Sequence, residues 1–417
     1  MEDGRQEGIR DADGYTTLVG MDAHSAKVSL CVMRWRRGDD PVVTREFTTD
    51  LKGLEATYAK RIPAGALTVL EASTNAFAIA RRLKAIGHKA EVLASDAASG
   101  MGRPDRVNDR IDARNLAIAY TKGKARTVRV PSPEYARLRE IWFGYRNAVK
   151  DTVRHSNRLW GFCSANGLDL PKRSPVLKVA GIEKAVNGKE WEGDGAFHAR
   201  MMLSEYAHAR ETRAAYERRI EEAVASNPRM ARAMQVKGVR YVVAFALSAF
   251  VEDVRRFESA KKLVSYVGLN PSVADSGTKE GRRRVSRYGR HDLKALMVEA
   301  AQSALSKGGL PMHVWARRKL ASGMSRHAVV CALARKMVCH LWHVLMGHPS
   351  PMAEPEKAFR CKLSRLAGKV GKAKIEALGH ESAAKFVEGV LATVRWQAAG
   401  DAAGDAAAGE GPPDRQR

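Results

Sequence analysis

The sequence predicts an α/β domain in the first third of the chain, followed by a largely helical region. Between Thr16 and Ala94, short apolar runs of strand length alternate with segments of helical periodicity, which is typical of a sheet covered by helices. From Glu134 onwards, apolar residues recur at helical intervals over longer segments. The 417 residues are enough for two or three domains, and an apolar content of 45% can fill their cores.

The first predicted strands meet at an acidic residue. The run TTLVGMDAHSAKVSLCVMR, which starts at Thr16, gives two short strands with a polar break at residues 23–27, and a third strand is expected at 43–47. Asp22 closes the first strand beside the turn. Because an acid at such a strand end is a common position for a metal ligand, Asp22 is a candidate site residue.

Helices and strands then alternate along the chain. Residues 51–60 predict a helix, and the buried strand LTVLEA at 67–72 ends in a second acid, Glu71. A helix at 75–86 and a strand at 89–94 follow. The domain therefore carries two acids at the ends of two separate strands.

Two further acids lie on the next predicted helix, in the stretch NDRIDARNLAIAY at residues 108–120. Asp109 and Asp112 are three residues apart, so they share one helix face. Two carboxylates on one face repel each other unless a cation lies between them, and Mg²⁺ prefers such oxygen ligands. The alternative is a pair of solvated aspartates at a helix start, where acids suit the helix dipole.

The charge of the chain calls for a polyanionic partner. The formal net charge is +25 and the isoelectric point is about 10.0, which favours nucleic acid. An acidic membrane surface is the rival, but the apolar run Tyr241–Val251 is too short to span a bilayer. The longer run Ala328–Gly347 is interrupted by Arg335, Lys336 and His340. We therefore expect no membrane segment.

The chain ends and the cysteines indicate a cytoplasmic protein. The N-terminal residues MEDGRQEGIRDADG are polar and acidic, unlike a signal peptide, and residues 1–15 look disordered. Five cysteines without a CxxC pair suggest free thiols in a reducing compartment, with no disulfide framework or zinc site. We expect a bacterial, nucleoid-associated location.

The element order resembles the ribonuclease-H-like fold, and the acids make the resemblance specific. Asp22, Glu71, Asp109 and Asp112 match the DEDD order of RuvC-like nucleases. Their surroundings, GMDAHS, VLEAS and NDRIDARNLA, are similar to those of DEDD-type insertion-sequence transposases, a group that includes the Piv-type DNA invertases. The resemblance covers residues 16–348. It implies that the four acids hold Mg²⁺, with Mn²⁺ as the alternative ion; purely structural acids are the competing interpretation.

Long helices follow this domain. Residues 134–166 predict one basic helix with apolar residues spaced by four and three, which is the coiled-coil interval; an ordinary amphipathic helix is the alternative. Residues 171–200 look irregular, and a helix returns at 201–225. The resemblance implies that this region joins two domains, helps protomers associate as a dimer or tetramer, and touches nucleic acid.

A glycine turn begins the second half of the chain. Gly238 separates two apolar helices and resembles the helix-hairpin-helix of the family, where the turn lies near the DNA backbone. The family more often has GIG, whereas this chain has Gly238, Val239 and Arg240. Arg240 could supply charge to a phosphate, and a plain structural hairpin remains the alternative.

A serine in the polar loop Asn270–Gly289 is the candidate nucleophile. The run SAKKLVSYVGLNPSVADSG resembles the C-terminal transposase domain of the family, whose serine before glycine is the nucleophile, so Ser276 is the choice and Ser272 the fallback. Asp275 departs from the small residue usual there, and a turn-capping serine is the alternative. The predicted nucleic-acid contacts are Arg240 and the cations in and beside this loop. These loop cations would also stabilise charge on an attacked phosphate, and they are Lys279, Arg282, Arg283, Arg284, Arg287 and Arg290.

The predicted organisation has five segments. They are a disordered N-terminus at 1–15, a RuvC-like DEDD domain at 16–130, a helical coiled-coil or linker region at 131–228, a C-terminal transposase domain with the serine at 229–348, and a basic helical tail with a disordered end at 349–417.

The resemblance implies a DNA transposase or recombinase of an insertion sequence. It would cut and rejoin donor and target DNA through the acids and a phosphoseryl link, with a structured guide RNA as a further partner. A metal-dependent junction nuclease with an idle Ser276 is the first alternative, and a non-catalytic nucleic-acid-binding protein is the second. A covalent protein–DNA adduct would separate the transposase from both.

Overall fold

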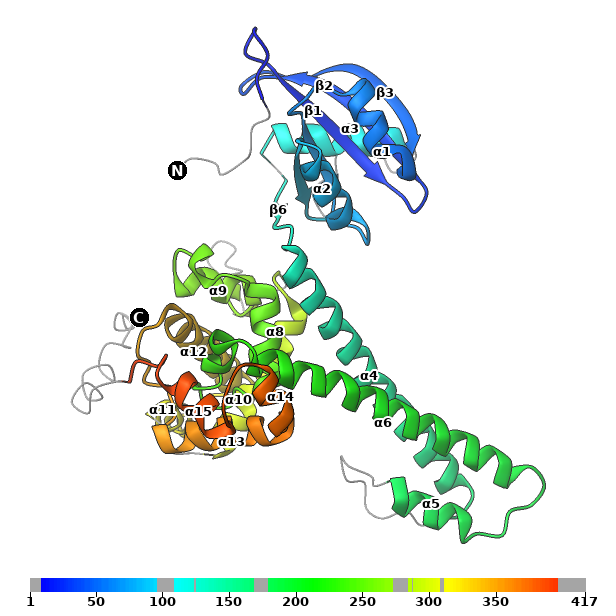
Figure 1. The fold of residues 1–417 in the computed structure, drawn as a ribbon, viewed down its shortest axis with the longest axis vertical. Coiled ribbons are helices and arrows are strands. Elements are labelled where there is room, and N and C mark those ends of the chain that lie inside the picture. Colours follow the sequence, from blue (N-terminus) through cyan, green and yellow to red (C-terminus); the bar gives the residue numbers. More distant parts are fainter. Residues whose placement is uncertain are drawn as a thin grey trace. The chain divides into compact units, whose positions relative to one another are not determined.

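The chain forms two units, each with its own hydrophobic core. In this computed structural model the described residues are 9–95, 109–123, 125–168, 179–272, 284–286, 288–307 and 311–396. The contacts between residues divide the chain into unit 1, Met1–Pro133, and unit 2, Glu134–Arg417 (Figure 1).

Unit 1 is a mixed sheet with helices on both faces. In chain order its elements are β1 (Thr16–Ala23), β2 (Lys27–Trp35), β3 (Val42–Asp50), α1 (Leu54–Arg61), β4 (Leu67–Glu71), α2 (Ala76–Ala85), β5 (Lys89–Leu93), α3 (Asp109–Thr121) and β6 (Thr127–Val128). The sheet order is β3-β2-β1-β4-β5-β6. β4 is parallel to both β1 and β5, and the other neighbours are antiparallel. The elements expected up to α3 are all present, whereas β6 was not predicted.

Alternate residues of the central strands serve two different cores. Val19 and Met21 of β1 pack with α1 and α2, whereas Leu18 of β1 and Val69 of β4 pack with α3. This division follows from the two-residue period of a strand, because successive side chains point to opposite faces. Both faces of β1 and β4 are therefore buried, which explains their nearly continuous apolar sequences.

Helix α3 approaches β1 very closely at Gly20. A Cβ atom at this position would lie 1.9 Å from the carbonyl oxygen of Ala113, and therefore inside its van der Waals radius. Only glycine lets the helix backbone come this near to the strand. The contact fixes α3 against β1 two residues before Asp22 and one residue after Asp112.

Replacing Gly20 with alanine should therefore destabilise unit 1. Extra atoms in a packed core usually cost about 1–3 kcal/mol, and the obstacle here is backbone that cannot move aside as a flexible side chain can. We expect a loss at the upper end of that range in chemical denaturation. Gly53→Ala is the matched control, because its Cβ would meet open space. Equal stability of the two variants would contradict the close approach.

Unit 2 is helical apart from one short strand pair. Its elements are α4 (Pro133–Ala165), α5 (Val179–Asn187), α6 (Gly195–Ala225), α7 (Pro228–Ala233), α8 (Tyr241–Val251), α9 (Ala260–Val267), β7 (Pro271–Ser272), β8 (Arg284–Val285), α10 (His291–Lys307), α11 (Pro311–Ala321), α12 (Arg326–Met346), α13 (Glu356–Val370), α14 (Lys372–Ala377) and α15 (Ala383–Leu391). One large core joins α8, α9, α10 and α12 to α13 and α15.

Helices α4 and α6 form a long antiparallel pair (Figure 1). A Cβ on Gly144 would lie 2.4 Å from the ring of Tyr216, so a larger residue would require that ring to move. Further along, the Thr152 hydroxyl donates to the carbonyl oxygen of Ala209 at 3.2 Å. The two helices run in opposite directions along this contact. Helix α6 therefore packs against α4 within unit 2.

A separate small core lies at the far end of this pair. Leu159 and Cys163 of α4 pack there with Ile182 and Val186 of α5 and with Leu203 of α6. The prediction that residues 171–200 are irregular was therefore wrong for 179–187 and for 195–200, which are helical. Several Gly and Lys residues in this stretch hid the apolar periodicity of α5.

Helix α12 is the one described helix that is long and apolar enough to cross a membrane. Most of it is buried inside unit 2, where Val329, Leu333, Met337 and Leu341 belong to the main core. An apolar helix with this burial is the central helix of a folded domain, as the cations within its sequence also indicate.

Candidate functional site

Two of the predicted acids lie at the ends of adjacent parallel strands. In β1 and β4, Met21 is paired with Leu70, so continuing the register by one residue puts Asp22 beside Glu71. Leu18 and Val69, which precede them at even spacing, face α3. By the same period, Asp22 and Glu71 point toward that helix. Both acids are only partly buried.

The third acid comes from α3. Ala113 and Leu116 of this helix are buried against the sheet, and Asp112 lies half-buried beside them. The pKa of Glu71 is raised from its ordinary value, first by burial and then by the negative charges of Asp22 and Asp112. Three carboxylates from three separate elements are thus near enough to act on one another.

The fourth predicted acid, Asp109, is the first residue of α3. Its side chain lies outside the described part of the structure, so its place relative to the other three stays a prediction. Among the described residues no group of three or more His, Cys, Asp or Glu side chains is arranged as a metal cage. Carboxylates repel one another without a cation between them, so they are expected to stand apart in the protein alone.

Three residues that the sequence interpretation missed lie beside these acids. His24 Nε2 lies 3.2 Å from Asp22 Oδ2. Asn75 Nδ2 donates to the carbonyl oxygen of His24 at 3.0 Å, and Ser73 Oγ donates to Asn75 Oδ1 at 3.0 Å. These bonds tie the turn after Asp22 to the loop after Glu71. The polar residues that follow each acid in the sequence were the signal that could have indicated these contacts.

Ser276 lies outside the described residues, but both ends of its loop are well defined. β7 and β8 pair antiparallel, with Ser272 opposite Arg284. A Cβ on Gly289 would lie 2.5 Å from the Cα of Gly268, so two glycines pack together just outside the pair. The described residues on either side of the segment that carries the candidate nucleophile, Ser272 and Arg284, are therefore held side by side.

Of the predicted nucleic-acid contacts, Arg240 and Arg290 have described side chains. Arg240 is exposed and precedes α8. Arg290 instead makes two hydrogen bonds with Asp292, at 3.2 and 3.1 Å, and its guanidinium lies 3.7 Å from the Phe250 ring centroid. Burial alone would raise the pKa of Asp292, but the hydrogen bonds and charge of Arg290 outweigh it and lower that pKa. The charge of Arg290 is already compensated within the fold.

The other predicted cations stay predictions. Lys279, Arg282, Arg283 and Arg287 lie outside the described residues, and Arg284 is described only in its backbone, as part of β8.

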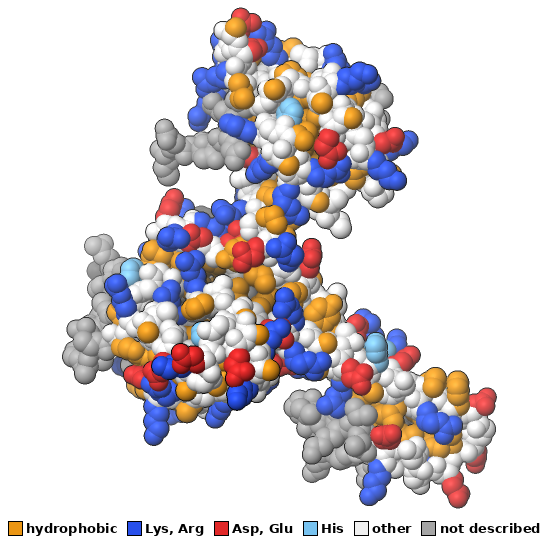
Figure 2. All heavy atoms as spheres, in the orientation of Figure 1, with side chains coloured by type: hydrophobic (Ala, Val, Ile, Leu, Met, Phe, Trp, Pro, Cys, Tyr) orange, Lys and Arg blue, Asp and Glu red, His pale blue; other side chains and the backbone are white. Residues whose placement is uncertain are grey.

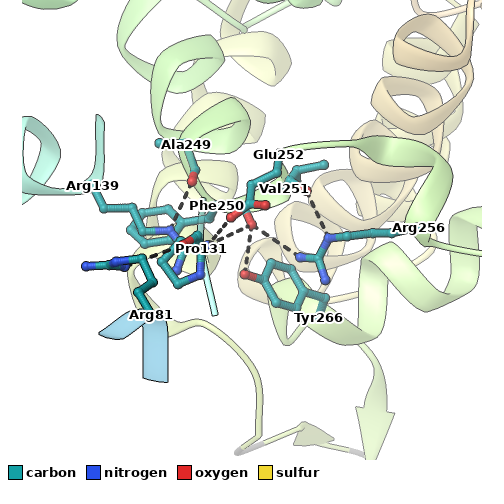
Figure 3. A network of polar contacts seen from close by, with 9 residues as sticks. All are labelled: Arg81, Pro131, Arg139, Ala249, Phe250, Val251, Glu252, Arg256 and Tyr266. Carbon is teal, nitrogen blue, oxygen red and sulfur yellow. Dashed lines mark hydrogen bonds and ion pairs between the residues drawn. The ribbon is translucent and has the colours of Figure 1, made fainter. Parts of the chain in front are cut away.

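Several arginines of unit 2 hold the fold together at the end of α8 (Figure 3). Arg139 Nε donates to the carbonyl oxygen of Ala249 at 3.0 Å, and Arg256 Nε to that of Val251 at 2.9 Å. Glu252 and Arg139 form a buried ion pair of 3.2 Å. Cations placed at the carbonyl end of a helix stabilise it. These arginines are therefore not part of a nucleic-acid surface.

Basic side chains remain abundant on the outside. Lys and Arg are spread over the visible face of each unit, with Asp and Glu among them (Figure 2). This distribution fits a net charge of +25 and the contact of several surfaces with a polyanion.

Comparison with known proteins finds a similarity within unit 2. Residues 230–313, from α7 to the start of α11, match the sequence profile of the Transposase IS116/IS110/IS902 family. This segment includes the Gly238 turn, β7 and β8. This part of unit 2 is therefore similar to the transposase domain of that family.

Similarity to individual transposases covers a larger share of the chain than this profile does. A probable family 20 transposase of Pseudomonas aeruginosa is 23% identical over 67% of this chain and 83% of its own length. The transposase for insertion sequence element IS1328 of Yersinia enterocolitica is 21% identical over the same shares. The transposase for insertion sequence element IS1111A of Coxiella burnetii is 24% identical over 57% of this chain and 66% of its own length.

Proposed function

We propose that this protein is the transposase of an insertion sequence and that it cuts and rejoins DNA with two sets of residues. The first set is the acids of an RNase-H-like unit 1, and the second is Ser276 of unit 2. The single observation that carries the proposal is the convergence of Asp22, Glu71 and Asp112 from β1, β4 and α3, in a chain whose second unit matches a transposase domain.

The donor set suits a hard divalent cation. Asp22, Glu71 and Asp112 offer carboxylate oxygens, which Mg²⁺ and Mn²⁺ prefer, and Asp109 begins the same helix. When bound, such a cation would polarise the scissile phosphate and activate the attacking oxygen. The repulsion that raises the pKa of Glu71 is the repulsion that a bound cation would relieve.

In the proposed exchange the Ser276 hydroxyl supplies the nucleophile. Its Oγ forms a bond to phosphorus as the bond from phosphorus to a deoxyribose oxygen breaks, and the hydroxyl proton is lost while the released oxygen gains one. One phosphoester replaces another, so rejoining needs no external energy source. The neighbouring cations would stabilise the charge on the attacked phosphate. A guide RNA and a dimer or tetramer are further parts of the proposal and rest on the family resemblance.

Asp112→Asn tests the metal site. Removing one ligand charge should abolish DNA cleavage while DNA affinity stays near that of the wild type, since affinity depends mostly on Lys and Arg. Mg²⁺ or Mn²⁺ should also raise the melting temperature of the wild type much more than that of the variant, because only the wild type binds the ion tightly. The control is Asp40→Asn, which makes the same charge change at an exposed turn. Wild-type cleavage by Asp112→Asn would remove this residue from the proposed site.

A metal-dependent junction nuclease is the second candidate. The convergence of Asp22, Glu71 and Asp112 would serve hydrolysis of DNA as well as strand exchange. Hydrolytic nicking in Mg²⁺ without a covalent protein–DNA adduct would support the nuclease.

A further inference from the structure

A cavity of about 610 Å³ opens in unit 2 between the turn before α8 and the helix α13. Pockets that hold ligands commonly measure roughly 300–1,000 Å³. The turn contributes Lys237, Gly238, Arg240 and Tyr241, and α13 contributes one face of its length. The transposase profile ends at residue 313, so α13 lies beyond the segment that it matches.

The wall formed by α13 is fixed to the turn by one partly buried lysine. Lys362 Nζ donates to the carbonyl oxygens of Met234, Val236 and Val239 at 2.8, 3.3 and 3.1 Å. The carboxylate of Glu354 lies 3.0 Å from the same nitrogen and balances its charge. Because hydrogen bonds from Lys362 join the helix to the turn, the two walls of the cavity are held together within unit 2.

Two more of the cavity lysines are also compensated. Lys369 Nζ lies 2.6 Å from Glu221 Oε1 and donates to the Tyr241 hydroxyl at 3.0 Å. Lys237 Nζ lies 3.6 Å from Glu354, which it shares with Lys362. These pairs hold the walls in place and leave little charge for a ligand.

Arg240 and Arg365 differ from the lysines. Both line the cavity, one on each wall, and both are exposed. Within the described parts of the chain neither has a carboxylate partner at ion-pair distance. Arg240 also precedes α8, whose first N–H groups receive no side-chain cap from it. Two arginines without a carboxylate partner among the described residues thus line one cavity.

We propose that this cavity binds a phosphodiester of a nucleic-acid backbone between Arg240 and Arg365. The guanidinium fork matches two phosphate oxygens, and a phosphate would supply the charge that both arginines lack. The inference rests on the proposed function, because it assumes that the partner of this basic chain is nucleic acid. DNA and RNA share the chemistry, and the experiment below distinguishes them.

Cys361 provides a direct probe, since it lines the cavity and is the one exposed cysteine among the five of this chain. The rate of its alkylation by a fluorescent iodoacetamide is measured in the full-length protein alone, with duplex DNA and with an RNA hairpin. We expect several-fold slower alkylation with at least one of them, and the protecting polymer identifies the source of the phosphate. Arg365→Ala should abolish the protection.

Salt dependence gives an independent measurement on the same variant. Losing one phosphate contact lowers the slope of log affinity against log salt by about 0.9 for duplex DNA. The affinity advantage of the wild type over Arg365→Ala should therefore shrink about 3.5-fold between 50 and 200 mM salt. Arg360→Ala is the matched control, because Arg360 lies on the same helix and pairs with Glu356 and Glu388. Its slope should equal that of the wild type.

The outcomes distinguish failure of this inference from failure of the proposed function. Unchanged alkylation of Cys361 under saturating DNA and RNA, with binding confirmed by anisotropy, would overturn the cavity as a binding site and leave the transposase proposal standing. An unchanged salt slope for Arg365→Ala would overturn it as well. A wild-type protein that binds neither polymer would instead contradict the proposed function itself.

Discussion

Ser276→Ala is expected to abolish strand exchange while DNA binding persists. The substitution deletes the Oγ atom that would bond to phosphorus and hardly changes the bulk of the side chain. A change of this size outside a core usually alters stability by less than about 0.5 kcal/mol. With a nicked suicide substrate, the wild type should accumulate a denaturant-stable protein–DNA adduct, and proteolysis should place the link on the peptide that contains Ser276. The variant should form none.

Ser272→Ala is the natural control, because Ser272 is the fallback nucleophile and begins the same loop as part of β7. It should retain exchange. An adduct on Ser272 or on a tyrosine would keep the recombinase and move its nucleophile. Nicking without any adduct would favour the junction nuclease.

Glu252→Ala should destabilise unit 2 by about 3–5 kcal/mol, because it leaves a buried arginine without its counter-charge. The side chains of Arg139 and Glu252 are only 11% and 3% exposed, and their atoms lie 3.2 Å apart. Burial already lowers the pKa of Arg139, which shows how costly its charge is at this site. Denaturant unfolding followed by circular dichroism measures the loss.

The double variant Arg139→Met with Glu252→Ala tests the cause. Replacing both charges by uncharged groups removes the unpaired ion, so much of the lost stability should return. If the double variant is as unstable as the sum of both single variants, the ion pair is not the source of the effect. Glu252 also has a φ of 58°, so Glu252→Gly should lose less stability than Glu252→Ala.

The sequence predicted most of unit 1 because its signals are local. The apolar runs around Asp22 and Glu71 have strand length, and the helix that begins at Asp109 has a clear period, so these elements were placed within a residue or two. Parallel pairing of β1 with β4 then brings two acids together. The close approach at Gly20 could not be predicted, because it depends on Ala113, more than ninety residues further along the chain.

The cations of unit 2 were harder to interpret for the same reason. Arg290 was a predicted nucleic-acid contact, and Arg139 lies in the helix predicted to be basic. In the structure Asp292 and Glu252 neutralise these two arginines. The Arg139 pair joins positions 113 residues apart, and nothing in the local pattern indicates it. Conversely, nothing in the sequence around Arg365 indicates a site residue, because only folding brings α13 opposite the turn before α8.

The short pairing of β7 with β8 also has an evolutionary consequence. The eleven residues 273–283 are flanked by β7 and β8. Pairing of these two strands keeps the ends of the segment together at any segment length. Doubling the length of a flexible loop costs only about 0.6 kcal/mol of closure entropy. Insertions and amino-acid substitutions in this segment can therefore accumulate without unfolding the helices of unit 2. Folding of the helices would therefore place little limit on the length of this segment, whereas the chemistry proposed for Ser276 would limit its sequence.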